Sequence, residues 1–351
     1  MTSSPPRTES AMELRFSLPA PVDLTPFRLH PQADQIEERS DAWAREHLAA
    51  AYPSREALEE FLERRAALWP CMSYPSADPG RLLWFCQWNQ YWFMLDDRSV
   101  YDSDLAADPG RARRTYAAIR QVLNESLPAA EVPGRLRPLA DLWAQSGPLM
   151  PAGLRARFAA STEDLLDGFE AEAALRADSA HTPDDLVTAR RKASGVWMCT
   201  TFVEWGLGID LTDDFAAHPA LGRLSVLAGE QMIYHNEILS FRKEHFSGDT
   251  MNLVTAWAGP GLHRLQEAVD RAHAAATRAE EDFVTERDLI LAGPLGERAD
   301  VRAYLDELGY LMAGCLRYEY LVPRYHGPGH LWDGTMSGTV ILTAERTVFA
   351  G

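Results

Sequence analysis

Apolar residues recur at helical spacing along most of this chain, and long runs of strictly alternating apolar and polar residues are rare. One helical segment starts at Ser54-Arg-Glu-Ala, a pattern typical of a helix N-cap, and stops before Pro70. Turn residues such as Gly293-Pro-Leu-Gly separate the segments. The pattern therefore predicts an all-α protein of about ten helices. The predicted helices cover residues 36–51, 54–69, 81–96, 111–124, 154–176, 183–206, 219–246, 262–290 and 301–321.

The two ends of the chain do not follow this helical pattern. Residues 1–25 are polar and rich in proline, so we expect a flexible N-terminal arm there. The clearest strand-like run, Thr339-Val-Ile-Leu-Thr, lies in residues 327–351, a C-terminal tail whose structure the pattern does not define. We expect residues 26–326 between them to form a single α-helical domain.

Composition and charge exclude several classes of protein. The 351 residues include 34 Lys and Arg against 51 Asp and Glu, a net charge of −17, which argues against nucleic acid or an anionic membrane surface as partner. No apolar run approaches the ~20 residues of a membrane span. The first residues lack the apolar core of a signal peptide, and four scattered cysteines form no C-x-x-C pair. We therefore expect a cytoplasmic protein with no membrane span.

Two adjacent carboxylates, Asp96 and Asp97, follow a strongly aromatic segment at the end of the predicted helix over residues 81–96. Carboxylate oxygens are ligands that suit Mg²⁺. On a helix, Trp88, Trp92 and Asp96 share one stripe, because a step of four residues turns only about 40°. The pair indicates either metal ligands at the rim of an aromatic cavity or a solvated acidic helix end.

A sharper pattern occurs in Asn236-Glu-Ile-Leu-Ser-Phe-Arg-Lys-Glu. Asn236, Ser240 and Glu244 are four residues apart, so a helix places their oxygen atoms on one face. Such a set suits a hard divalent cation that is also coordinated by phosphate. Lys243 lies beside the set, where it could reach the same anion. The alternative is an ordinary solvated polar face, which the apolar setting of this helix disfavours.

This segment resembles the Asn-Ser-Glu metal triad of microbial class I terpene cyclases, N-D/E-x-x-S-x-x-x-E with a lysine before the glutamate. The Asp96-Asp97 pair resembles the aspartate-rich motif that these enzymes carry on a facing helix. Arg190 lies at the family's spacing for its pyrophosphate-sensing arginine, and Arg324-Tyr325 resembles the family's C-terminal pair. The resemblance implies a class I terpenoid synthase-like helical bundle around a central active-site cavity.

The chain also departs from the family's motifs. The next acid after Asp97 is Asp102, which is displaced from its usual position, so we expect Asp97 to pair with a basic residue and to support the site without binding the metal itself. Tyr318 stands where the family commonly has tryptophan before the Arg-Tyr pair. Ser194 would mark the helix break that approaches the reacting carbon, and Gly195 beside it makes a break plausible.

By this resemblance, the protein ionises an all-trans isoprenyl diphosphate, farnesyl or geranylgeranyl diphosphate, with three Mg²⁺ ions. It then cyclises the carbocation to a sesquiterpene or diterpene and releases pyrophosphate. The implied metal ligands are Asp96, Asn236, Ser240 and Glu244. The implied pyrophosphate-binding residues are Arg190, Lys243, Arg324 and Tyr325. The aromatic residues expected to line the pocket are Trp69, Trp92, Phe93 and Tyr318.

Two alternatives remain open at this point. A chain-elongating prenyl diphosphate synthase is also all-α and Mg²⁺-dependent, but it would need a second D-D-x-x-D motif where this chain has the Asn, Ser and Glu set. A non-catalytic helical interaction protein would use its charged helices as solvated faces. A homodimer is compatible with the family resemblance, although no face in the sequence indicates one.

Overall fold

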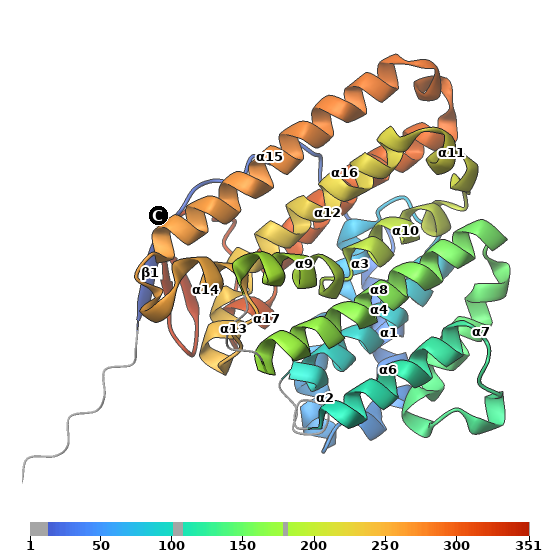
Figure 1. Cartoon of the computed structure of the whole chain (residues 1–351), viewed down its shortest axis with the longest axis horizontal. Helices are drawn as coiled ribbons and strands as arrows, with labels where there is room; N and C mark the ends of the chain where they lie inside the picture. The colour runs from blue at the N-terminus through green and yellow to red at the C-terminus, as the bar shows by residue number, and fades with distance from the viewer. Residues whose placement is uncertain (1–12, 101–107, 178–181, 351) are drawn as a thin grey trace, which may run out of the picture.

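Long helices packed side by side make up most of the protein (Figure 1). The structure is a computed structural model that describes residues 13–100, 108–177 and 182–350. The longest helices are α4 (Pro79–Val100), α8 (Ala152–Ala177), α12 (Pro219–Leu239), α15 (Leu265–Ala292) and α16 (Ala299–Leu321). None of the helices in these ranges combines the length and the apolar composition that crossing a bilayer requires.

Shorter helices connect and cover the long ones. They are α1 (Ala33–His47), α2 (Arg55–Leu62), α3 (Leu68–Ser73), α6 (Pro109–Leu123), α7 (Arg137–Ser146), α9 (Pro183–Ala193), α10 (Val196–Leu207), α11 (Thr212–Ala217), α13 (Phe241–Ser247), α14 (Leu253–Ala258) and α17 (Pro323–His326). Single 3₁₀ turns occupy Ala49–Ala51, Ala129–Glu131, Gly134–Leu136, Gly147–Leu149, Pro260–Leu262 and Pro294–Glu297. The predicted all-α architecture is confirmed for the body of the protein.

The helix predicted over residues 54–69 is two helices, α2 and α3. Arg65 adopts a positive φ of 55°, which an α-helix does not contain, and the chain turns there. Pro70, expected to stop the helix, lies instead in the first turn of α3. A proline is tolerated in the first turn because the N–H that it lacks would have no partner within the helix.

Helix α4 runs through the apolar core and places its last residues at the site. Phe85 of α4 stacks on Phe202 of α10, with 3.8 Å between ring centroids. One turn further on, Trp88 packs against Phe158 of α8. This packing on two sides fixes the rotation of α4 about its axis. Trp92 therefore follows Trp88 along the same stripe toward the cavity described below.

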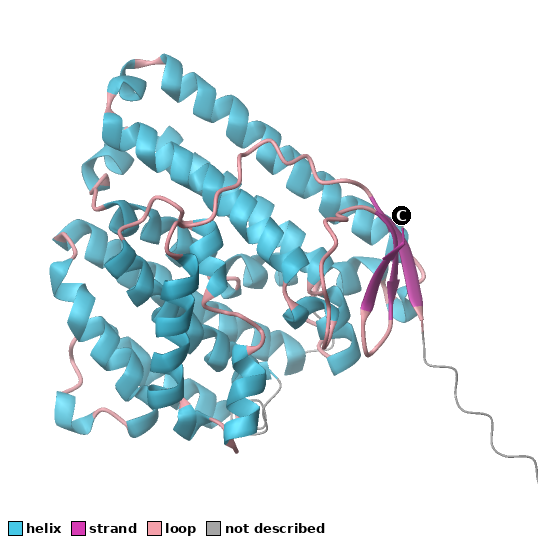
Figure 2. Cartoon of the chain, turned by 180° about the vertical axis from the view of Figure 1, so that it is seen from behind, coloured by secondary structure: helices cyan, strands magenta, loops and turns pink. Residues whose placement is uncertain are grey.

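The two ends of the chain form a sheet, in contrast to the arm and the undefined tail that the sequence suggested. Strands β1 (Leu14–Leu18), β2 (Gly338–Leu342) and β3 (Thr347–Ala350) are antiparallel in the order β1-β2-β3. Leu14 pairs with Leu342, and Thr339 pairs with Ala350. Figure 2 shows the three strands together at one edge of the molecule.

The sheet is joined to the helical body. Buried side chains from β1 and β2, among them Phe16 and Val340, pack into the same apolar cluster as Phe241 of α13. Gln266 of α15 exchanges two hydrogen bonds with the backbone of Ser17, at 2.7 and 2.9 Å. The boundary predicted at residue 26 therefore does not separate a loose arm from a domain, although residues 1–12 lie outside the described residues.

Candidate active site

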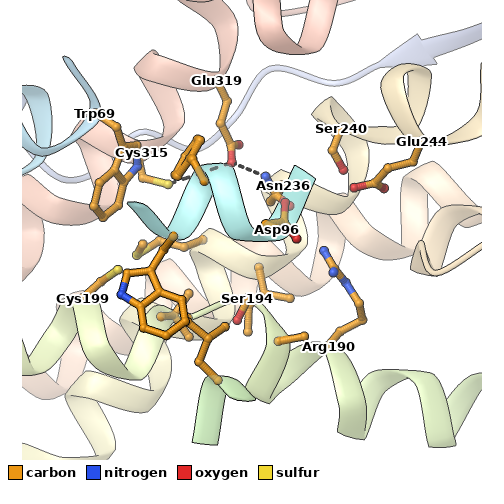
Figure 3. Close-up of a pocket in the computed structure, with 18 of the residues that line it drawn as sticks. Trp69, Asp96, Arg190, Ser194, Cys199, Asn236, Ser240, Glu244, Cys315 and Glu319 are labelled. Carbon is orange, nitrogen blue, oxygen red and sulfur yellow. Dashed lines mark hydrogen bonds between the residues drawn. The ribbon is translucent and has the colours of Figure 1, made fainter. Parts of the chain in front are cut away.

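One cavity brings together most of the residues that the sequence singled out (Figure 3). Its empty volume is about 1090 Å³, part of it open to solvent. The predicted residues that line it are Trp69, Trp92, Phe93, Asp96, Arg190, Ser194, Gly195, Asn236, Ser240, Lys243, Glu244, Arg324 and Tyr325. Asp97 and Tyr318 do not line it, and Asp102 lies outside the described residues.

Asn236, Ser240 and Glu244 project from one side of the join between α12 and α13. The join leaves the helical hydrogen bonds unbroken: the Ser240 N–H donates to the Asn236 carbonyl at 2.8 Å, and the Glu244 N–H donates to the Ser240 carbonyl at 3.1 Å. Figure 3 shows the oxygen atoms of Ser240 and Glu244 directed into the same space. The predicted one-sided arrangement is therefore present.

Asn252, the N-cap residue of α14, contacts two members of this set, Ser240 and Glu244. Its Nδ2 donates to Glu244 Oε2 at 2.7 Å and lies 3.5 Å from Ser240 Oγ. Burial raises the pKa of Glu244 to about 7, although Arg190 acts in the opposite direction. A cation in the cavity would favour the charged form of this carboxyl, because an opposite charge nearby lowers the pKa of an acid.

Asp96 of α4 lines the same cavity and lies close to Asn236 in the view of Figure 3. Its side chain is 38% exposed, and its Oδ2 accepts a hydrogen bond from Arg324 at 3.3 Å. The described residues contain no group of three or more His, Cys, Asp and Glu side chains that could hold a metal. A metal site here would therefore also use the amide and hydroxyl oxygens of Asn236 and Ser240. An all-oxygen set of this kind fits Mg²⁺ better than a softer metal.

Asp97 turns away from the cavity and pairs with basic side chains. Its carboxylate lies 2.6 Å from Arg64, 3.3 Å from Lys243 and 3.0 Å from Arg324. Burial opposes ionisation of Asp97, but Arg324, Lys243 and Arg64 outweigh it and hold its pKa well below the ordinary value. Lys243 and Arg324 also line the cavity. Asp97 therefore holds these two positively charged side chains in place at the mouth of the cavity.

Arg190 lines the cavity but is held by two buried carboxylates. Its Nε lies 2.6 Å from Glu237, and its Nη1 lies 2.8 Å from Glu172. Burial disfavours the charge, yet Glu237 and Glu172 keep the pKa of Arg190 above its ordinary value. Arg176 pairs with Glu172 and Asp249 beside it. The predicted arginine thus belongs to a larger network of charged groups.

The predicted helix break is present between α9 and α10. Helix α9 ends at Ala193, and Gly195 has a φ of 70°, in the left-handed region that favours glycine. Gly168 of α8 allows close packing here, since a Cβ on it would come within 2.2 Å of the Ala193 backbone nitrogen. Ser194 and Gly195 consequently reach the cavity wall.

The deeper wall of the cavity is apolar and rich in aromatic and sulfur atoms. Trp69, Trp92 and Phe93 line it, as predicted. The prediction for Tyr318 is wrong. Its ring is fully buried, and its hydroxyl donates to the Arg64 carbonyl at 3.1 Å, so it joins helices instead of facing the cavity. The remaining apolar lining consists of Leu165, Phe169, Ala193, Val196, Met198, Cys199, Met232, Ile233 and Cys315.

Several acidic lining residues were not predicted. Asp249 follows Gly248 directly after α13, so local sequence could have indicated it. Glu237, at the D/E position of the triad motif, does not line the cavity but pairs with Arg190. Glu172 on α8 gave no such signal. Glu319 on α16 is buried and accepts a hydrogen bond from Asn236 at 2.7 Å. Burial raises the pKa of Glu319 to about 8.

Comparison with known proteins agrees with this architecture. Residues 87–282 match the family model described as terpene synthase family 2, C-terminal metal binding. This range contains the predicted metal-binding residues and the helix break, whereas Arg324 and Tyr325 lie beyond it.

Two curated relatives and one solved structure illustrate the similarity. "Microbial Terpene synthase-like protein 13" of Selaginella moellendorffii is 29% identical over 310 residues, covering 86% of this chain and 84% of that protein. "Sesquiterpene synthase Agr3" of Cyclocybe aegerita is 27% identical over 342 residues, covering 93% and 92%. The linalool/nerolidol synthase of Streptomyces clavuligerus, solved with 2-fluorogeranyl diphosphate, has a TM-score of 0.70 at 21% identity, covering 85% and 97%. The fold of this chain is thus the class I terpenoid synthase fold.

Proposed function

This chain belongs to the terpene synthase family, and on that premise we propose that it ionises an all-trans isoprenyl diphosphate and cyclises the resulting carbocation. The protein is a class I terpene cyclase with a metal-binding domain. The match to the terpene synthase family model does not support the two alternatives, a prenyl diphosphate synthase and a non-catalytic helical protein. The metal's identity, the substrate's length and the residue roles below are parts of the proposal.

One observation carries the proposal: Asp96 of α4 and the Asn236, Ser240 and Glu244 set of α12 and α13 line the same cavity. We assign these four residues as ligands of Mg²⁺, with three ions expected. Bound Mg²⁺ would supply Lewis-acid neutralisation of the diphosphate. The all-oxygen donor set supports this choice.

The cationic side chains at the mouth bind the leaving group in this proposal. Lys243, Arg324 and Arg190 line the cavity on the side of the oxygen donors, and each can donate hydrogen bonds to diphosphate oxygens. Tyr325 lines the cavity next to Arg324 and can donate its hydroxyl proton to the same anion. Together they would stabilise the negative charge that develops as the C–O bond breaks.

The deeper wall protects and steers the carbocation. Trp69, Trp92 and Phe93 offer aromatic faces, each of which stabilises a nearby cation by about 0.5–2 kcal/mol. Apolar lining also excludes water, which would otherwise end the reaction early. Ser194 and Gly195 present backbone at the helix break, where a carbonyl dipole can approach the reacting carbon.

We favour the fifteen-carbon farnesyl diphosphate over geranylgeranyl diphosphate, because one curated relative is named a sesquiterpene synthase. The product would then be a sesquiterpene. A homodimer and a cytoplasmic location stay predictions.

The test is incubation of the purified protein with Mg²⁺ and geranyl, farnesyl or geranylgeranyl diphosphate in separate reactions, read by gas chromatography–mass spectrometry and by pyrophosphate release. We expect a cyclic hydrocarbon or alcohol from farnesyl diphosphate and none when EDTA replaces Mg²⁺. Longer prenyl diphosphates formed from added isopentenyl diphosphate would contradict the proposal, and so would the absence of product from all substrates.

A further inference from the structure

A buried glutamate on α16 holds the amide of a proposed metal ligand. Glu319 is 2% exposed, lines the cavity, and accepts a hydrogen bond through Oε1 from Asn236 Nδ2 at 2.7 Å. Cys315, one helical turn earlier, points its Sγ at the same oxygen at 3.9 Å. Figure 3 shows these three side chains linked in a row beside the cavity.

The contact selects one of the two orientations of the Asn236 amide. An asparagine side chain has an oxygen that can bind a metal and an NH₂ group that can only donate. In the structure, Glu319 Oε1 is the acceptor of this hydrogen bond, so it pairs with the NH₂ group and leaves the amide oxygen on the other side of the Asn236 side chain. If the amide turned over, its oxygen would face the Glu319 oxygen and its NH₂ group would face the metal.

We propose that Glu319 is a positioning residue that orients the Asn236 amide so that its oxygen is presented to the metal. This inference rests on the proposed function, in which Asn236 is a metal ligand. Groups that hydrogen-bond to a metal ligand commonly fix its orientation, and their loss weakens metal binding. Glu319 is well suited to this role because it comes from α16, a different helix from Asn236, and is itself buried.

The experiment measures Mg²⁺ binding in the presence of pyrophosphate by isothermal titration calorimetry. Glu319→Leu removes the acceptor, so we expect Mg²⁺ affinity to fall by about tenfold or more. Glu319→Gln keeps an oxygen that can accept from Asn236, so its loss should be smaller than that of the leucine variant. In an Asn236→Ala background, Glu319→Leu should add less than about twofold, because the group that it orients is gone.

Glu307→Leu is the matched control. Glu307 is a second buried glutamate of α16, outside the cavity, and accepts a hydrogen bond from the Ser76 N–H at 3.0 Å. Its replacement should lower Tm without weakening Mg²⁺ binding. Wild-type affinity in Glu319→Leu would overturn the inference. An equal loss of Mg²⁺ affinity from Glu319→Leu with and without Asn236 would also overturn it. So would a loss of Mg²⁺ affinity in Glu307→Leu as large as that in Glu319→Leu.

A second pair of variants keeps the test decisive if Glu319→Leu does not fold. Asn236→Asp sets two carboxyl groups against each other and should weaken Mg²⁺ binding. Adding Glu319→Gln to this variant supplies an NH₂ donor to the introduced carboxylate and should recover at least part of that loss. No recovery would overturn the inference. If the wild-type protein itself fails to bind Mg²⁺ and pyrophosphate, the proposed function fails, and the inference fails with it.

Discussion

Asp97 should stabilise the folded protein and, at the same time, compete with the anion at the mouth of the cavity. Its side chain is 14% exposed, and it is the carboxylate that Lys243 and Arg324 both contact. Replacing it by asparagine keeps the shape of the side chain and removes the charge. Lys243 and Arg324, 16% and 5% exposed, would then have lost their shared counter-charge.

The expected loss of stability follows from these distances. At an effective dielectric constant of about 20, a charge pair at this separation attracts by roughly 5 kcal/mol before the cost of burial is counted. Breaking a buried pair by removing one partner costs about 3–5 kcal/mol net. Arg64 is 39% exposed and can turn toward water, so we expect a value near the lower end. For a chain of 351 residues, that corresponds to a fall in Tm of about 4 °C.

Pyrophosphate with Mg²⁺ should raise the Tm of Asp97→Asn by more than it raises that of the wild type. In the wild type, the anion and Asp97 share Lys243 and Arg324, whereas in the variant Asp97 no longer competes with the anion for these two cations. A tenfold gain in affinity would add about 1.4 kcal/mol of stabilisation at saturating ligand. Differential scanning fluorimetry with and without Mg²⁺ and pyrophosphate measures both effects.

An ion pair with a more exposed arginine provides the control for this measurement. Asp214 pairs with Arg298, which is 41% exposed and does not line the cavity. Asp214→Asn should cost only about 0–1 kcal/mol and leave the ligand-induced shift as in the wild type. The reasoning is refuted if Asp97→Asn unfolds at the wild-type temperature, or if its pyrophosphate shift is the smaller of the two.

Three further outcomes are expected. Glu244→Ala should lower turnover of farnesyl diphosphate below detection while the far-ultraviolet circular dichroism spectrum stays helical; full turnover would remove it from the metal ligands. Trp92→Leu should change the product distribution seen by gas chromatography–mass spectrometry, whereas Tyr318→Phe should cost about 1 kcal/mol from the lost hydrogen bond and leave the products as they are. Burial raises the pKa of Glu307 to about 7, so the folded state retains its proton and stability should fall as pH rises from 5 to 8. Glu307→Gln should flatten that fall by up to about 3 kcal/mol in urea unfolding, and an unchanged slope would contradict this assignment.

The sequence was most informative where function depends on local helix geometry. Asn236, Ser240 and Glu244 are four residues apart, and any continuous helix brings them to one side, whatever it packs against. The sheet was predictable only in part. The alternation at Thr339-Val-Ile-Leu-Thr is visible in the sequence, but the partner of β2 is β1, at the opposite end of the chain. A strand pattern does not identify a partner so distant, because pairing depends on where the intervening helices bring the two ends.

Tyr318 was predicted to line the cavity, but its neighbour Glu319 does so instead. This difference shows why the rotation of a helix about its axis could not be predicted. Neighbouring residues on a helix differ by about 100° in direction, so the side chains of Tyr318 and Glu319 point to different sides. The resemblance to known motifs pointed to the tyrosine, because an aromatic residue commonly occupies that position. In the structure, the Tyr318 hydroxyl binds the Arg64 carbonyl, while Cys315 and Glu319, one turn apart, face the cavity. A buried acid needs a polar partner. The amide of Asn236 meets that need, so the contact that we propose to orient the metal ligand also supplies the partner of this buried acid.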